Sequence, residues 1–337
     1  LAPLSGSVTD VGVVGYTTGG GLGPMARTYG LASDRVRAIE VVTGDGELRR
    51  ATPTEHPDLF FALRGGKGAL GIVTAIEFDL VHEPSFYGGS LWFDGEHAAA
   101  VIQAWRSWIV DLPEAATTSF GLFQLPEMPG VPPMLPGKLT LSVRYLWTGD
   151  PAEGVRYFAA MRAAAPVLLD DVADKPYSAV DSVHTDPVDP LPAHESAMVL
   201  RDFPAEAADE LLRMAGPGSG SPQVLVEVRQ MGGATARSGA HESAFCARET
   251  AYSLLVVGIP MVPGAVAHGQ QVVDAMAPWF GTVRLPNFTS DPAELPNAPT
   301  TSGPGRSCGI QSAATTRPVS SRSGTRSRFE PAAQPTP

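Results

Sequence analysis

The chain has 337 residues, of which 43% are hydrophobic and 18% are charged, so it is long enough for two domains and too apolar to be disordered throughout or a coiled coil. Its net charge of −11 argues against nucleic acid or an anionic membrane surface as a partner, and no apolar run approaches the roughly 20 residues that span a bilayer. Two cysteines, Cys246 and Cys308, exclude a scaffold built from several disulfides and a cysteine zinc cluster.

The first block, residues 1–82, is rich in glycine and β-branched residues. The apolar run 11–16 predicts a short buried strand that leads into a glycine loop at 19–23. An Asp-Gly pair between two extended runs predicts a β-hairpin over 36–51. A short helix is expected at 56–63, and alternating apolar residues predict a strand at 72–80.

The second block, residues 83–284, shows helical periodicity first at 96–112. There Val101, Trp105, Trp108 and Leu112 form a stripe that we expect to pack on a sheet containing 139–147 and 224–230. Alternation over 139–147 predicts a half-buried strand. The remaining expected elements are helices at 151–165, 204–214 and 264–279 and strands at 224–228 and 251–259. This succession predicts a layered α+β fold.

The last stretch, residues 299–337, differs in composition from the rest of the chain. It is rich in Ser, Thr, Pro and Arg, and its large aliphatic residues are Ile310 and Val319. Such a segment cannot bury a core, so we expect it to be disordered.

The glycine loop has several possible interpretations. Residues 21–26 formally match a dinucleotide-binding pattern, but Gly30 interrupts the helix that should follow and Glu40 arrives too early to contact a ribose. The glycines can instead form tight turns, or they can let the backbone approach a pyrophosphate or a ring closely. Lys67 lacks the hydroxyl residue of a phosphate-binding loop and is expected to be a solvated loop residue.

Other catalytic patterns are weak. The seven histidines are scattered, and no pair has the spacing of a helical metal site. The chain also has no nucleophile elbow between a strand and a helix. Glycine loops without an obvious protein nucleophile indicate that a cofactor carries the chemistry.

The motifs as a set resemble those of the berberine-bridge-enzyme-like flavin oxidases, in the vanillyl-alcohol-oxidase superfamily. They occur in family order at 4–7, 12–23, 29–34, 36–51, 57–66 and 71–74, with looser matches at 229–234 and 285–288. The resemblance covers residues 1–298 and is strongest up to residue 82.

The resemblance implies an α+β protein with a PCMH-type FAD-binding domain, represented by its second half only, and a substrate domain with an antiparallel sheet covered by helices. The implied ranges are 1–82 for the FAD-binding part, 83–284 for the substrate domain, 285–298 for a segment that returns to the FAD-binding part, and 299–337 for the tail. The cofactor implied is FAD, with no metal. Its contacts would be Gly12, Tyr16, Gly19, Gly20, Gly21, Gly23, Gly71, Ile72, Val73 and Asn287.

Three departures from the family qualify this picture. The earlier half of the FAD-binding domain, with its flavin-linking His, is absent and the chain starts at Leu1 without an initiator Met, so we expect a fragment. Val8 stands where bicovalent members carry a Cys, which excludes a cysteinyl flavin link. The family ending is lost after Ala298, and a frameshift near that residue is one hypothesis for the tail.

The function implied is an FAD-dependent oxidoreductase. A small-molecule substrate, through an alcohol, sugar hydroxyl or amine carbon, would pass hydride to the flavin, and oxygen or another acceptor would reoxidise it. Tyr16 and Gln230 are the candidate catalytic residues. The alternatives are a non-catalytic binding protein of the same fold and, less favoured, an NAD(P)-dependent dehydrogenase. The sequence leaves both a cytoplasmic and a secreted location open.

Overall fold

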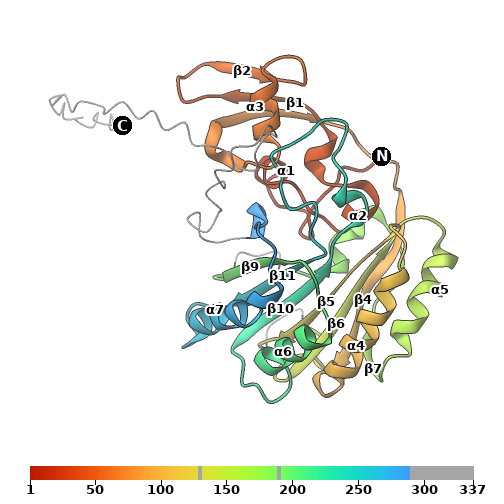
Figure 1. The fold of residues 1–337 in the computed structure, drawn as a ribbon. Helices are drawn as coiled ribbons and strands as arrows, with labels where there is room; N and C mark the ends of the chain where they lie inside the picture. Colours follow the sequence, from red (N-terminus) through yellow and green to blue (C-terminus); the bar gives the residue numbers. More distant parts are fainter. Residues whose placement is uncertain (128–130, 188–190, 289–337) are drawn as a thin grey trace, which may run out of the picture.

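The computed structural model describes residues 1–127, 131–187 and 191–288, whose strands form two antiparallel sheets (Figure 1). The small sheet lies above the large one in Figure 1, and helices cover the face of the large sheet that points away from the small sheet. The predicted α+β architecture, with an antiparallel sheet covered by helices, is therefore confirmed. The tail 299–337, with its suspected frameshift, and all but the first four residues of the segment 285–298 lie outside the described residues.

The small sheet has the strand order β2-β1-β3, with β1 (Val36–Val42) in the centre. β1 and β2 (Leu48–Ala51) form the predicted hairpin, in which Val41 pairs with Arg49. β3 (Ile72–Phe78) pairs with the other edge of β1. The helix α3 (Pro57–Leu63), also as predicted, buries Phe60 and Leu63 against this sheet.

The large sheet has the order β7-β4-β6-β5-β10-β11-β9, and β8 pairs with β4. Its strands are β4 (Ser85–Asp94), β5 (Ala116–Gln124), β6 (Leu139–Trp147), β7 (Val167–Asp170), β8 (Ala173–Pro176), β9 (His194–Leu200), β10 (Gln223–Gln230) and β11 (Tyr252–Gly258). All of these pairings are antiparallel.

One face of the large sheet packs against helices. These are α4 (Ala98–Trp108), α5 (Pro151–Arg162), α6 (Ala205–Ala215) and α7 (Ala265–Ala275), which all lie on the same side of the sheet in Figure 1. The predicted stripe of α4 is confirmed: Trp105 is fully buried, and its ring centroid lies 5.0 Å from that of Phe120 on β5. Trp108 is only half-buried, at the margin of this core.

The opposite face of the large sheet is also covered. Leu22 and Leu31 from the N-terminal block form one cluster with Val199 on β9. Another cluster joins Met25 to Leu146 on β6. The prediction that 139–147 is half-buried was therefore wrong, because the N-terminal block removes the second face of β6 from solvent as well.

The apolar run 11–16 is the clearest error of the sequence-based prediction. The chain forms a short helix there, α1 (Val13–Thr18), in which the Tyr16 amide donates to the Gly12 carbonyl at 3.1 Å. Val11 and Val13 are exposed rather than buried. Hydrophobic composition alone does not separate a short helix from a short strand, and the run is too short for its periodicity to decide.

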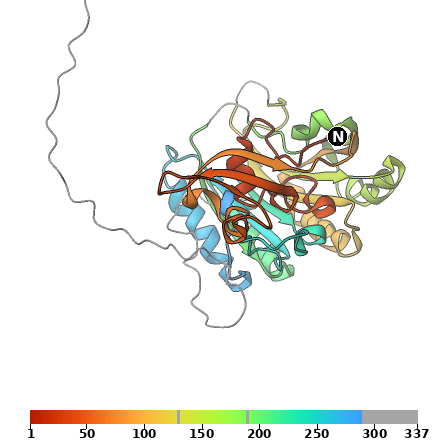
Figure 2. The same ribbon diagram turned by 90° about the horizontal axis from the view of Figure 1, so that it is seen from above.

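Seen from above, the small sheet lies across the large one (Figure 2), and the N-terminal segment with α1 lies between the two sheets in Figure 1. A short helix, α2 (Ala26–Tyr29), carries the buried Arg27 in this region. Among the described helices, none is long and apolar enough to cross a membrane. The predicted domain boundaries remain predictions.

Candidate functional site

The glycine loop is packed tightly around the ring of Tyr16. A Cβ atom on Gly23 would lie 2.0 Å from the Ser5 carbonyl oxygen and 2.7 Å from the Tyr16 hydroxyl. On Gly21, whose φ is +77°, a Cβ would lie 2.5 Å from Ala32 Cβ. These two glycines are therefore required for close packing of the protein on itself.

Asn287 joins the same cluster from the far end of the described chain. Its Nδ2 donates to the Tyr16 carbonyl oxygen at 2.8 Å, and a Cβ on Gly19 would lie 1.9 Å from its Oδ1. Next to it, a Cβ on Gly20 would lie 2.5 Å from the ring of Phe245. The structure thus brings together Tyr16, Asn287 and the 19–23 glycines, which the sequence placed near one ligand.

Lys67 is tied to this cluster rather than solvated. Its Nζ donates to the Pro286 carbonyl oxygen at 2.7 Å, and the side chain is partly buried. Burial lowers the pKa of Lys67, and Glu195 opposes this shift. The prediction of a solvated lysine was wrong because a segment more than 200 positions away in the sequence supplies its acceptor.

The Tyr16 hydroxyl is buried, and none of the described residues forms a hydrogen bond with it. Burial raises the pKa of Tyr16 far above its ordinary value; Tyr177 adds to the shift and Arg229 opposes it. Tyr16 therefore stays protonated, and its hydroxyl is an unused hydrogen-bond donor.

Gly12 and Gly15 lie in open space instead. A Cβ on either residue would meet nothing within 4 Å. The neighbouring Val11 and Val13 side chains are exposed. We call the exposed residues Val11, Gly12, Val13 and Gly15, which lie at and just before the start of α1, the apolar strip of α1; a flat ring can approach the glycine backbone there closely.

The third predicted segment, 71–73, follows the short helix η2 (Lys67–Leu70), which contacts α1. A Cβ on Gly71, whose φ is +150°, would lie 2.3 Å from the Val42 carbonyl oxygen. Ile72 is 73% exposed, whereas Val73 packs on the core of the small sheet. The segment therefore presents Ile72 outward beside the turn that Gly71 makes possible.

A charged row crosses the inner face of the large sheet, the face turned toward the N-terminal block. Arg229 on β10 pairs with Ser119 on β5, which in turn pairs with Arg144 on β6. Paired residues in antiparallel strands point to the same side of the sheet. Arg144 and Arg229 are both buried, at 2% and 5% exposure.

Glu227, two residues before Arg229 on β10, lies between these guanidinium groups. Its Oε1 is 3.0 Å from Arg144 Nη1 and 3.2 Å from Arg229 Nη2. Burial alone would raise its pKa, but the charges of Arg229 and Arg144 outweigh burial and hold the pKa of Glu227 well below its ordinary value. Glu227 is therefore an ionised carboxylate.

His184 completes this cluster from a loop. Arg229 Nη2 lies 2.9 Å from His184 Nε2, and the His184 carbonyl oxygen accepts from Arg144 Nη2 at 3.2 Å. Burial, together with Arg144 and Arg229, lowers the pKa of His184 well below its ordinary value. Because the guanidinium can only donate, His184 Nε2 must be the acceptor, and the proton of this neutral ring sits on Nδ1.

Gln230 does not join either cluster. It follows Arg229 on β10 and therefore points to the helix-covered face, where its Nε2 donates to the Ile109 carbonyl oxygen at 3.1 Å. The structure separates Gln230 from Tyr16 by the thickness of the sheet, so its predicted catalytic role gains no support from its position.

The sequence contained a usable signal for part of the charged row. Glu227 and Arg229 are two residues apart in an apolar strand, which places both on one face, and Arg144 interrupts another apolar strand. A charged side chain within a buried strand points to a partner or a function. His184 gave no such signal, because only the tertiary fold brings its loop to the sheet.

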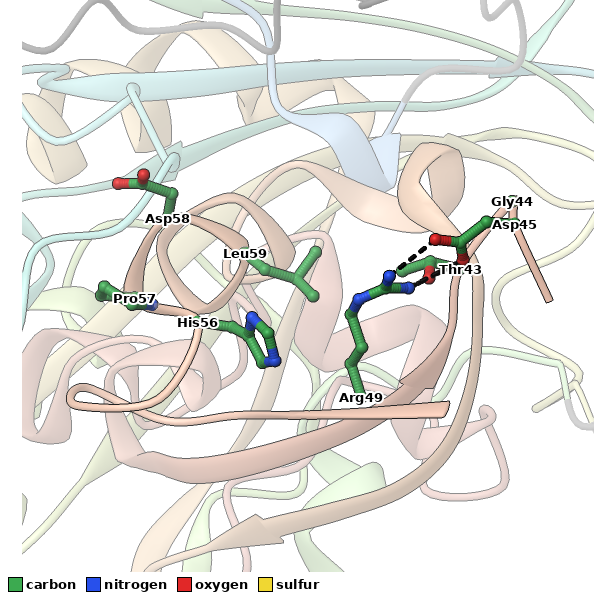
Figure 3. A pocket seen from close by; sticks show the side chains of 8 residues that line it. All are labelled: Thr43, Gly44, Asp45, Arg49, His56, Pro57, Asp58 and Leu59. Atoms are coloured by element: carbon green, nitrogen blue, oxygen red, sulfur yellow. Dashed lines mark hydrogen bonds and ion pairs between the residues drawn. The ribbon is translucent and has the colours of Figure 1, made fainter. Parts of the chain in front are cut away.

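A wide surface pocket of about 990 Å³ lies apart from these clusters, between the hairpin and α3 (Figure 3). Arg49 is the one arginine or lysine among the residues that line this pocket. It donates two hydrogen bonds to Asp45, of 2.7 and 2.6 Å. None of the predicted site residues lines the pocket. Within the described ranges, no group of three His, Cys, Asp or Glu side chains could hold a metal ion.

Comparisons with known proteins agree with these motifs. Residues 1–52 match the family model of the FAD binding domain. Over 104 residues the chain is 38% identical to an FAD-linked oxidoreductase of Arthroderma benhamiae, covering 31% of this chain and 21% of that protein. Over 75 residues it is 49% identical to the FAD-linked oxidoreductase tazG of Aspergillus terreus, covering 22% and 15% of the two chains.

Solved structures share the fold at low sequence identity. With 6-hydroxy-D-nicotine oxidase from Arthrobacter nicotinovorans the TM-score is 0.69 at 19% identity, over 86% of this chain and 65% of the other. With berberine bridge enzyme from Eschscholzia californica it is 0.69 at 17% identity, over 84% and 60%. The chain therefore spans less than two thirds of these structures and about a fifth or less of the two curated relatives.

These findings confirm the resemblance that the motifs predicted: the chain carries sequence of an FAD binding domain, is related to FAD-linked oxidoreductases, and has the fold of the berberine-bridge-enzyme-like flavoproteins.

Proposed function

We propose that this chain belongs to an FAD-dependent oxidoreductase in which the flavin ring lies along the apolar strip of α1 and the outward side of 71–73. The single observation that carries the proposal is the buried hydroxyl of Tyr16, a residue of α1, which has no hydrogen-bond partner among the described residues. A buried polar group without a partner costs free energy, so a ligand that accepts its hydrogen bond would be stabilised.

The residues of this strip fit a flavin. Gly12 and Gly15 leave room for close approach, and Val11 and Ile72 offer exposed apolar surface to a flat ring. The glycines at 19–23, by contrast, would act indirectly, because the space beside them is taken by Ser5, Ala32, Phe245 and Asn287. They would fix the position of Tyr16 rather than touch the cofactor.

Bound FAD would supply a two-electron acceptor for hydride from a substrate C–H, such as an alcohol, sugar hydroxyl or amine carbon. Tyr16, protonated because it is buried, would orient the substrate or the ring by donating a hydrogen bond. Glu195 is the candidate proton acceptor on β9, since burial and then Asp186 raise its pKa above the ordinary value of a glutamate. The inner face of the large sheet would cover the substrate and exclude water.

The test is to reconstitute the purified protein with FAD, remove free FAD by gel filtration, and record the visible absorbance of the retained flavin. Anaerobic addition of candidate alcohols, sugars and amines should then bleach the flavin. Tyr16→Phe keeps the ring that fills the glycine loop, so it should retain FAD while slowing the bleaching. A folded protein that retains no flavin would refute the proposal and favour a non-catalytic binding protein of the same fold.

A further inference from the structure

Lys67 adopts a backbone conformation that lysine rarely takes. Its φ is +59°, in the left-handed region, whereas a glycine at this position would adopt that φ without strain. Its sequence neighbours at positions 65, 66 and 68 are all glycines. A left-handed residue other than glycine persists where the surrounding structure holds it, and such residues gather at functional sites. We therefore expect contacts of the Lys67 side chain to stabilise this conformation.

The ammonium group of Lys67 is held beside strand β9. Its Nζ donates at 2.7 Å to the carbonyl oxygen of Pro286, in the short helix η8 (Pro286–Phe288), and η8 contacts β9. Glu195 is the second residue of β9 and shares a face of the strand with Val199, which packs against the N-terminal block. A fixed positive charge and a partly buried carboxylate therefore meet on the inner face of the large sheet.

Glu195 has charged neighbours of both signs. Burial raises its pKa and Asp186 adds to that rise, whereas Lys67 and then His194 lower it. His194 directly precedes Glu195 in the strand, so its side chain points to the opposite face of the sheet. The coupling between Lys67 and Glu195 is reciprocal, because Glu195 opposes the fall that burial causes in the pKa of Lys67.

We propose that Lys67 is a positioning residue for Glu195: its fixed ammonium keeps that carboxylate ionised, and so able to accept the proton of the substrate, although the carboxylate is partly buried. Without this cation, burial and the neighbouring Asp186 would make Glu195 hold a proton of its own more tightly, and a protonated carboxyl group cannot act as a base. The inference rests on the proposed function in treating Glu195 as the proton acceptor; the electrostatic coupling itself needs no turnover.

Substitutions of Lys67 can separate its charge from its backbone conformation. Lys67→Gly removes the ammonium and suits the left-handed φ, so it should fold, whereas Lys67→Arg keeps the positive charge. Lys138→Gly, which removes an exposed lysine paired with Asp94, is the matched control. In protein labelled with ¹³C at the glutamate carboxyl groups, the Glu195 resonance is assigned by its loss in Glu195→Gln and followed through a pH titration, with and without FAD.

We expect the titration midpoint of Glu195 to move to higher pH in Lys67→Gly and to stay in place in Lys67→Arg and in Lys138→Gly. In protein that retains FAD, the rise of the bleaching rate with pH should move in the same direction in Lys67→Gly. A purely structural role of Lys67 would change the stability of the protein but neither midpoint. Lys67→Gln, which keeps a hydrogen-bond donor for Pro286, replaces Lys67→Gly if that variant does not fold.

An unchanged Glu195 midpoint in Lys67→Gly would overturn the proposal, whether or not the protein retains FAD. A shifted midpoint with an unshifted pH profile of bleaching would also overturn it, because Glu195 would then not be the proton acceptor. A shifted midpoint in a protein that retains no flavin would uphold the coupling between Lys67 and Glu195 while refuting the proposed function.

Discussion

The substitution Gly23→Ala adds one methyl group where the glycine loop meets Tyr16. The new Cβ would lie 2.0 Å from the Ser5 carbonyl oxygen, which is backbone and cannot rotate away, and 2.7 Å from the Tyr16 hydroxyl. Both distances are far inside van der Waals contact, so the loop or the ring must move. Overpacking of this kind costs about 1–3 kcal/mol and sometimes more, and we expect a loss of that size in the free energy of unfolding.

Gly12→Ala is the matched control, because its Cβ would meet nothing within 4 Å. As a change at the N-cap of α1, it should alter the free energy of unfolding by less than about 1 kcal/mol. Urea unfolding followed by tryptophan fluorescence gives both values. FAD titration separates the two positions further: Gly12→Ala should weaken FAD binding through direct contact, with the fold intact. If Gly23→Ala is as stable as the unsubstituted protein, the reasoning about the loop fails.

Two further predictions concern the large sheet. Trp105→Ala should lower the free energy of unfolding by about 3–5 kcal/mol, because Trp105 is fully buried against Phe120. Trp108→Ala should lower it by only about 1.5–3 kcal/mol, because Trp108 is half-buried. Urea unfolding of the two variants measures both losses, and the reverse order would contradict the prediction. His184 stays neutral when folded but takes up a proton when unfolded, so stability should fall below about pH 6.5 by up to about 1.4 kcal/mol per pH unit. His184→Gln should flatten that part of the pH profile, and an unchanged slope would show that His184 is protonated in the native protein.

Elements with a complete local pattern could be predicted from the sequence. The helix at 98–108 has an apolar stripe on one side only, and the hairpin at 36–51 has an Asp-Gly turn between two strands. By contrast, the strands at 85–94 and 116–124 were not predicted from the sequence. Both strands are buried on both faces, so neither shows the alternation that marks a half-buried strand.

The candidate site was predictable only where it coincides with a family motif. Tyr16, Asn287 and the glycines of the loop lie together in the structure, and their contacts with a cofactor remain a prediction. The cluster of Arg144, Glu227 and His184 is assembled from two strands and a loop, and no local pattern links these positions. Its chemistry follows from burial and from hydrogen-bond accounting, which require the tertiary structure.

Three cationic side chains of the N-terminal block donate hydrogen bonds to backbone carbonyl oxygens elsewhere in the molecule. Arg27 donates to the carbonyl oxygens of residues 112, 116 and 231, and Arg64 donates to those of residues 241 and 242. Lys67 likewise donates to the carbonyl oxygen of residue 286.

Every residue carries a backbone carbonyl oxygen whatever its side chain. Substitutions on the accepting segments therefore leave these hydrogen bonds intact as long as the backbone conformation is unchanged. Side chains on the accepting segments can therefore diversify during evolution, or be redesigned, without loss of these hydrogen bonds.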